Sequence, residues 1–244
     1  MKVKEDVGRE RTKILIPTNF TGHAAIAGDY ALRMLEGLPC TCLLETVYMP
    51  PRGSAGTLIK IADILMREAA EGLRKEREAM EFAHPGIQVQ TKAEEGDAAS
   101  VIGGSMKKEK ADLLVIGHNS HVKKFLSRII ESPDTWPALL VPNKHYEAPP
   151  KSALCVCSPE CGQSGLNDTV AAVEKRIEGR ARKIHFAENE PPEALKKQIE
   201  TSLRKNSTDM VIFKVAKRSE FEGIIRTHLL DEIILKYPVL LLSC

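Results

Sequence analysis

The stretch DLLVIGHNSHVKKF, residues 112–125, runs a fully apolar strand into a glycine and then into a polar loop that opens onto a helix. A strand without polar alternation is typical of a parallel sheet that is buried on both faces. A strand, a glycine turn and a helix start are also the parts of a phosphate-binding loop, because backbone N–H groups at a helix N-terminus can point at an anion. After Gly117, however, the loop contains no further glycine. The stretch therefore predicts a fold more clearly than it predicts a chemistry.

Composition and charge place the chain among soluble globular proteins. It has 244 residues, of which 43% are hydrophobic and 28% are charged, and 35 basic residues balance 33 acidic ones. A net charge of +2 predicts neither a nucleic-acid partner nor an anionic membrane. The first residues are charged throughout and no stretch approaches the ~20 apolar residues of a membrane helix, so we expect a cytoplasmic protein. In that compartment the six cysteines are expected to be reduced thiols.

Outward from this stretch, short β-type runs alternate with longer helical patterns. This alternation predicts an α/β fold with a doubly wound parallel sheet. Five strands and four helices are complete by Pro142, a proline-bearing linker covers residues 143–151, and a shorter version of the pattern follows. The predicted strands are 13–18, 40–49, 87–95, 111–117, 137–142, 152–158, 181–188, 209–215 and 237–243.

The two halves resemble one unit used twice. ADLLVIGH and WPALLVP in the first half correspond to TDMVIFKV and YPVLLLS in the second, so that an aspartate precedes a buried strand and an aromatic-proline pair opens the last one. We therefore expect two domains, residues 1–145 and 146–244. The second has about four strands, and the missing strand-helix unit should shorten its sheet at one edge.

The last strand of each half is an apolar edge that invites pairing. Because a short linker holds the two copies at a high effective concentration, the edges can meet within one chain. The sequence predicts an intramolecular pseudo-dimer in which Leu139–Val141 runs antiparallel to Val239–Leu241.

A family resemblance adds to this interpretation. KILIPTNFTGHAAIAGDYAL, EEGDAASVIGGSMKKEKADLLVIG and WPALLVP resemble the universal stress protein family in tandem form, over residues 13–143 and more weakly over 152–243. The resemblance implies flavodoxin-like (Rossmann-like) domains, the first with strand order 3-2-1-4-5, that commonly pair through their last strands. In members that bind ATP, an aspartate after the first strand contacts the adenosine. Their phosphate loop has the pattern glycine, two residues, glycine, nine residues, glycine, and serine or threonine.

The residues of this chain depart from that nucleotide-binding pattern. Gly117 matches the first glycine, but Ser120 stands at the second. Ile130 and Glu131 stand where the last glycine and the hydroxyl are expected. Glycine matters in this loop because backbone N–H groups reach phosphate oxygens only where no Cβ blocks the approach. A glutamate beside the phosphates would also repel them. Asn19 replaces the aspartate and can hydrogen-bond, but it carries no charge.

The second half retains less of the pattern, since Lys214 stands at the position of Gly117 and Pro159 at that of Asn19. Both sites are therefore interpreted as degenerate, with no bound cofactor. ATP in the first domain is the alternative, because the fold still places a crevice at the carboxyl ends of its first and fourth strands. If a nucleotide binds there, the residues expected to contact it are Thr18, Asn19, Val47, Gly117, His118 and Ser120.

Other candidate sites have ordinary explanations. His118 and His121 lie in the same loop, but two histidines without a nearby carboxylate or cysteine make a poor metal site, so no metal is predicted. Cys155 and Cys157 share one face of a strand, where they are poorly placed for a mutual disulfide and suit a protein core. With Cys161 they carry no predicted redox or metal role.

Two classes of function remain. No nucleophile has a partner at a recognisable spacing, so no catalytic residue is assigned. The first class is a non-catalytic stress-response or regulatory binding protein, with an unknown protein partner and homodimer formation as a further option. The second is an ATP- or AMP-binding universal stress protein that hydrolyses ATP slowly in its first domain.

Overall fold

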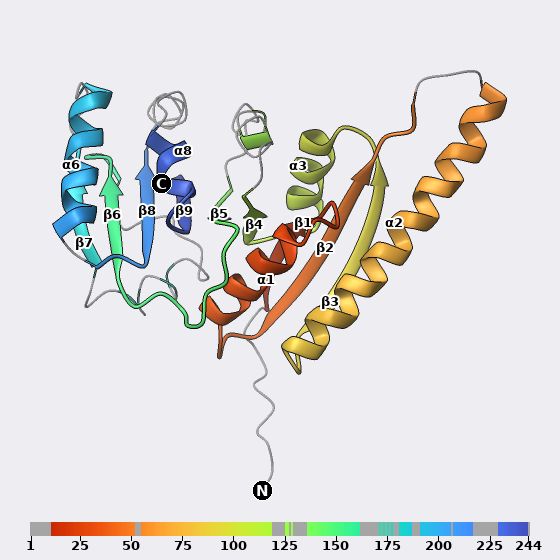
Figure 1. The fold of residues 1–244 in the computed structure, drawn as a ribbon, viewed down its shortest axis with the longest axis horizontal. Helices are drawn as coiled ribbons and strands as arrows, with labels where there is room; N and C mark the ends of the chain where they lie inside the picture. Colours follow the sequence, from red (N-terminus) through yellow and green to blue (C-terminus); the bar gives the residue numbers. More distant parts are fainter. Residues whose placement is uncertain are drawn as a thin grey trace, which may run out of the picture.

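The computed structural model describes residues 11–51, 55–118, 125–126, 128, 136–161, 171, 173, 175, 177, 181–186, 191–205, 207–216 and 229–243. Their strands form one nine-stranded sheet in the order β3-β2-β1-β4-β5-β9-β8-β6-β7. The helices lie on both sides of this sheet (Figure 1). None of the helices in the described part of the chain combines the length and the apolar character that a membrane crossing requires.

The described part of the first half contains five strands and three long helices in the predicted alternation, and the fourth predicted helix, which carries Val122 to Ile130, lies mostly outside the described residues. Asp97 caps α3 as expected, because its side chain accepts a hydrogen bond from the backbone N–H of Ser100. Gly37 follows α1 with a positive φ of 81°, which glycine adopts without strain. The elements are β1 (Thr12–Pro17), α1 (His23–Met34), β2 (Cys40–Tyr48), α2 (Ala55–Ala83), β3 (Gln88–Glu95), α3 (Ala98–Lys108), β4 (Leu113–Gly117) and β5 (Ala138–Val141).

The described residues of the second half form four strands, the number predicted. The segment between β8 and α8 lies mostly outside the described residues, as does much of the helix expected near residues 166–178. The described elements are β6 (Ala153–Cys157), β7 (Ala181–His185), α6 (Pro192–Lys205), β8 (Met210–Val215), α8 (Leu229–Ile234) and β9 (Val239–Ser243).

The order of the strands confirms the predicted 3-2-1-4-5 arrangement of the first half. In the second half, β7, β6, β8 and β9 follow the order of β2, β1, β4 and β5, and no strand among the described residues corresponds to the edge strand β3. The two halves meet where β5 pairs antiparallel with β9, with Leu139 opposite Leu240. This is the strand pairing that the sequence predicts.

Residues along each central strand alternate between two apolar layers. On one face, Ile102 and Met106 of α3 pack with inward residues of both halves, including Leu140 and Leu241. On the other face, α1 and α2 pack against a second layer that includes Leu139. Both layers run across the β5–β9 junction, which makes that junction part of the core.

The aspartate that both halves place before a buried strand has the same structural role twice. Asp112 accepts a hydrogen bond from the backbone N–H of Lys13, at 2.8 Å, where β1 begins. Asp209 accepts from the backbone N–H groups of Lys151 and Ser152, each at 2.8 Å, just before β6. In each half this carboxylate therefore links the start of two neighbouring strands, β4 with β1 in the first half and β8 with β6 in the second. Correspondence of these contacts supports the interpretation of the halves as copies of one unit.

The linker, residues 143–151, is mostly exposed but makes specific contacts through Lys144 and Tyr146. The ring of Tyr146 lies 4.8 Å from the ring of Tyr30 on α1, and burial raises the pKa of both phenols. Lys144 Nζ donates to the carbonyl of Lys236 in the second half at 3.2 Å. The linker therefore contacts both halves.

The cysteines differ in one respect from the prediction. Cys155 and Cys157 are buried and form no disulfide, as expected for strand residues of a core. Cys161, in contrast, is disulfide-bonded to a partner outside the described residues, so the expectation that all six cysteines are reduced is wrong. Cys161 follows β6 in a turn, where its contacts depend on the fold and cannot be judged from sequence spacing.

Candidate functional site

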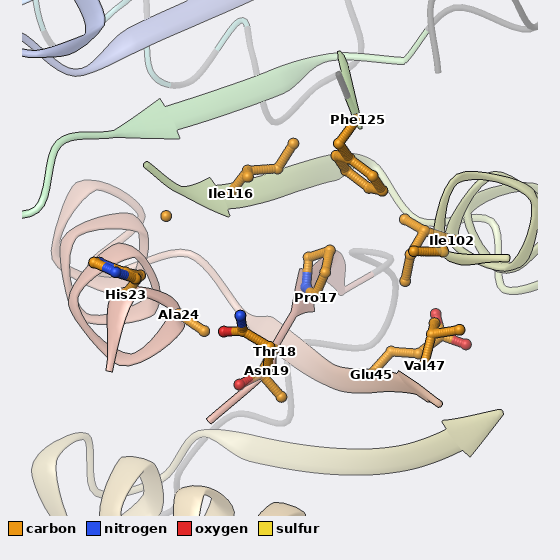
Figure 2. A pocket seen from close by; sticks show the side chains of 12 residues that line it. Pro17, Thr18, Asn19, His23, Ala24, Glu45, Val47, Ile102, Ile116 and Phe125 are labelled. Atoms are coloured by element: carbon orange, nitrogen blue, oxygen red, sulfur yellow. The ribbon is translucent and has the colours of Figure 1, made fainter. Parts of the chain in front are cut away.

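A pocket opens at the carboxyl ends of β1, β2 and β4, on the side of the sheet that α3 covers (Figure 2). It encloses about 190 Å³, less than the roughly 300–1,000 Å³ of a typical ligand site. Its apolar walls include Val47, Ile102, Ile116 and Phe125. Its polar lining residues are Thr18, Asn19, His23 and Glu45.

The turn after β1 supplies Thr18 and Asn19, and its own hydrogen bonds use both side chains. Thr18 Oγ1 accepts from the backbone N–H of Phe20 at 3.0 Å, which stabilises the positive φ of 62° at Phe20. Asn19 Oδ1 accepts from the Thr21 hydroxyl at 2.6 Å. The side-chain oxygen that stands in the position of the family's aspartate is therefore engaged within the turn.

Gly117 ends β4 at the pocket, and its lack of a side chain is required for packing. A Cβ at this position would lie 2.2 Å from the carbonyl oxygen of His23 and 2.5 Å from its carbonyl carbon. Real Cβ atoms do not approach that closely, so only glycine lets the first turn of α1 rest against the end of β4. Close packing alone thus accounts for this glycine.

His118 follows Gly117 but is not among the described pocket-lining residues. Its backbone N–H donates to the carbonyl of Val141 at 2.8 Å and extends the β4–β5 pairing. Burial lowers the pKa of the imidazole, the neighbouring His23 lowers it further, and Asp231 of the second half partly offsets both effects. The neutral imidazole that results offers little attraction to a phosphate.

Glu45 is a buried carboxyl in the wall formed by β2. Its side chain is fully buried, and Oε1 accepts from the Ser105 hydroxyl at 2.6 Å and lies 3.1 Å from Lys92 Nζ. Oε2 is buried and has no hydrogen-bond partner in the described structure. Burial raises the pKa of this carboxyl, and a hydrogen bond with the Glu94 side chain raises it further, although Ser105 and Lys92 act in the opposite direction. Lys92 also pairs with Glu94 on the edge strand.

A second carboxyl approaches the turn from α2. Burial raises the pKa of Glu76, against the opposing effect of the Thr18 hydroxyl. Gly72 of α2 lets the helix approach the turn this closely, because it leaves room for the ring of Phe20. A Cβ on residue 72 would lie 2.7 Å from that ring. Within the described residues, no group of three or more histidine, cysteine or carboxylate side chains is arranged to hold a metal ion.

A sequence profile of the universal stress protein family matches residues 10–132, half of the chain. The chain belongs to the universal stress protein family. Comparison with curated protein sequences gives no match.

Solved structures of universal stress proteins share its architecture. A universal stress protein from Archaeoglobus fulgidus is 13% identical, with a TM-score of 0.60, and the alignment covers 95% of this chain and 98% of the other. A Pseudomonas aeruginosa PAO1 protein of unknown function is also 13% identical, with a TM-score of 0.52 over 96% of this chain and 92% of the other. At these identities the likeness shows the fold alone.

Members of the family include nucleotide-binding ones. A universal stress protein family protein from Arabidopsis thaliana was solved with AMP bound; it is 16% identical, with a TM-score of 0.39, over 56% of this chain and 93% of the other.

Most residues predicted to contact a nucleotide in this universal stress protein do meet at one pocket. Thr18, Asn19, Val47 and Gly117 line it, whereas His118 lies beside it and Ser120 falls outside the described residues. Ile130 and Glu131, on which the interpretation of a degenerate phosphate loop depends, also fall outside them.

The sequence interpretation missed Glu45, His23 and Phe125. Glu45 had a detectable signal, since it is the one charged residue in the otherwise uncharged strand CTCLLETVY.

Proposed function

We propose that this universal stress protein is a non-catalytic, regulatory binding protein whose nucleotide sites have lost the ability to hold a polyphosphate. The observation that carries the proposal is the buried carboxyl of Glu45 in the pocket wall. Among the described residues that line the pocket, none is a lysine or arginine. Because Lys92 pairs with Glu45 and no basic residue lines the described pocket, an anionic ligand would find no cation to attract it there.

Two further features support this proposal. Asn19 replaces the acidic residue expected to contact the adenosine part of ATP, and its side-chain oxygen already accepts from Thr21. In the second half, Lys214 takes the place of Gly117 within β8, where it lies opposite Cys157 of β6. A lysine side chain at a position that needs close backbone approach is incompatible with a phosphate loop of the family type.

The proposed organisation is two domains, residues 1–145 and 146–244, that act as an intramolecular pseudo-dimer. Pairing of β5 with β9 supports it, because that pairing uses the last strand of each half. In this arrangement the surface and crevice of the first domain serve binding to a partner.

The alternative function is binding of ATP or AMP in the first domain with slow hydrolysis of ATP. The convergence of Thr18, Asn19, Val47 and Gly117 at one pocket favours it.

Isothermal titration of the full chain with ATP and with AMP separates the two proposals. We expect no binding at micromolar concentrations. Restoring the family pattern by Ser120→Gly, Ile130→Gly and Glu131→Ser should then raise the affinity for ATP. Micromolar binding of ATP to the unmodified protein would refute the proposed function and favour the alternative.

A further inference from the structure

A second pocket lies at the opposite end of the first half, where β1, β2 and β3 begin. This amino-end pocket is lined by Arg11, Leu32, the turn that follows α1 (residues 35–40) and the turn that follows α2 (residues 84–87). α1 and α2 both end beside it, at the lower edge of the first half in Figure 1. The pocket encloses about 330 Å³, which lies within the range of small-molecule sites.

Apolar side chains and two exposed charges of opposite sign line the amino-end pocket. Leu32 and Leu35 are buried there, and Ile87 is half-buried. Arg11 and Glu36 form no ion pair, either with each other or with another described residue. The guanidinium of Arg11 donates to Gln88 Oε1 at 3.0 Å and has further N–H donors. Both charges are therefore available to a ligand.

Two further groups add hydrogen-bond acceptors at this pocket. The carbonyl of Leu32 accepts no backbone hydrogen bond in the described structure, because the N–H of Glu36, its ordinary partner, donates to Arg33 instead. Nε2 of His84 lies 3.0 Å from Asp29 Oδ1, and because a carboxylate only accepts, Nε2 carries the hydrogen. In the neutral imidazole Nδ1 is then an acceptor, and it has no partner among the described residues. These acceptors and the negative end of the α1 dipole favour a positively charged N–H donor.

The arrangement of charges restricts the class of ligand. An anion would be attracted by Arg11 but repelled by Glu36, and a cation would meet the reverse. Arg33 lies close enough to Glu36 for their charges to interact, but its guanidinium is held by Asp29 at 2.9 Å. A zwitterion offers each charge an opposite partner, and the apolar lining favours one that also carries an apolar side chain.

We propose that the amino-end pocket binds a small zwitterion with an apolar side chain, such as free leucine. The carboxylate pairs with Arg11, the ammonium group pairs with Glu36 and donates to Nδ1 of His84, and the side chain packs on Leu32 and Ile87. This inference goes beyond the proposed function, because the amino-end pocket shares no residue with the pocket at the carboxyl ends of the strands. It gives a regulatory binding protein a small-molecule signal at a site of its own.

Titration of the full chain with leucine, followed by NMR chemical shifts, tests the inference. We expect saturable binding at millimolar concentrations, because both charges of the pocket are exposed to solvent. N-acetylleucine lacks the ammonium charge and leucinamide lacks the carboxylate, so each should bind about fivefold more weakly than leucine. Glycine carries both charges without an apolar side chain and should also bind at least about fivefold more weakly.

Variants of the two exposed charges locate the site. Arg11→Gln and Glu36→Gln should each weaken leucine binding about fivefold. Arg11→Gln should not weaken the binding of leucinamide, which has no carboxylate to lose a partner, and Glu36→Gln should not weaken that of N-acetylleucine. The control Lys75→Gln removes a charge that pairs with Glu71 on the exposed face of α2 and should leave leucine binding unchanged.

The outcomes separate this inference from the proposed function. If neither leucine nor another apolar amino acid binds at millimolar concentrations, the inference is refuted while the proposed function stands. Leucinamide or N-acetylleucine that binds as tightly as leucine would refute the recognition of a zwitterion. Leucine binding that both variants leave unchanged would refute the assignment to this pocket. Micromolar binding of ATP would refute the proposed function without affecting the inference.

Discussion

Replacement of Gly117 by alanine tests whether this glycine is retained for packing. The added Cβ would lie 2.2 Å from His23 O, 2.5 Å from His23 C and 2.8 Å from His23 Cβ. Two of the three contacts are with backbone, so the strain can be relieved only by moving α1 away from β4. Overpacking a core lowers the free energy of unfolding by about 1–3 kcal/mol. Because the backbone of α1 and that of β4 both resist displacement, we expect Gly117→Ala to cost about 3 kcal/mol. At about 2–4 °C per kcal/mol for a chain of this size, the melting temperature should fall by about 6–12 °C.

The matched control is Gly104→Ala, in α3 of the same half. A Cβ at Gly104 would meet nothing within 4 Å, and alanine is a better helix former than glycine. This variant should be more stable than the unmodified protein by about 0.5–1 kcal/mol.

Urea and thermal unfolding, followed by the fluorescence of Trp136, the single tryptophan, measures both variants. If Gly117→Ala melts within about one degree of the unmodified protein, the packing argument for this glycine is wrong.

Three other predictions concern the junction, the buried carboxyl and the thiols. Leu140→Asp places an unpaired charge in the β5–β9 core and should cost about 3–5 kcal/mol and cause aggregation in gel filtration, whereas Leu235→Asp on the exposed surface should change stability by less than about 0.5 kcal/mol. Because burial raises the folded-state pKa of Glu45, its contribution to stability is present at low pH and is lost as pH rises above its ordinary value of about 4.3. Urea unfolding from pH 4 to 7 should therefore show the unmodified protein losing stability relative to Glu45→Gln. If the free energies of unfolding of the two proteins change with pH in parallel, the predicted direction is wrong. Cys155 and Cys157 should react with a thiol reagent only as fast as the protein unfolds, as followed by mass spectrometry, and rapid labelling in the native state would show that β6 is accessible.

Much of the fold can be predicted from sequence because its signals are local. Apolar runs such as LLVIG and LLLS specify buried strands, Asp97 specifies a helix start, and an aspartate before a strand marks the repeat. The β5–β9 pairing was predictable as well, since each half ends in an apolar edge that needs a partner.

The candidate site was only partly predictable because its contacts join distant segments. Glu45 lies opposite Lys92 through the register of β2 with β3, and it meets Ser105 only once α3 has packed on that face. The sequence contains all three residues but not their alignment. The contact between Tyr146 and Tyr30 could not be predicted for the same reason. The sequence of the linker, which is polar and contains prolines, does not show what its residues will contact.

The junction between β5 and β9 also has a consequence for how the two halves can diverge. In a two-fold symmetric homodimer the contact is self-complementary, so every substitution appears on both sides at once, and folding depends on protein concentration. Here Leu139 faces Leu240, and Leu140 faces Val239, within one polypeptide. Each side of the contact is encoded separately, so a substitution in one half is not repeated in the other. Folding of the pair is then independent of dilution, and the asymmetry between the halves carries no penalty at their interface.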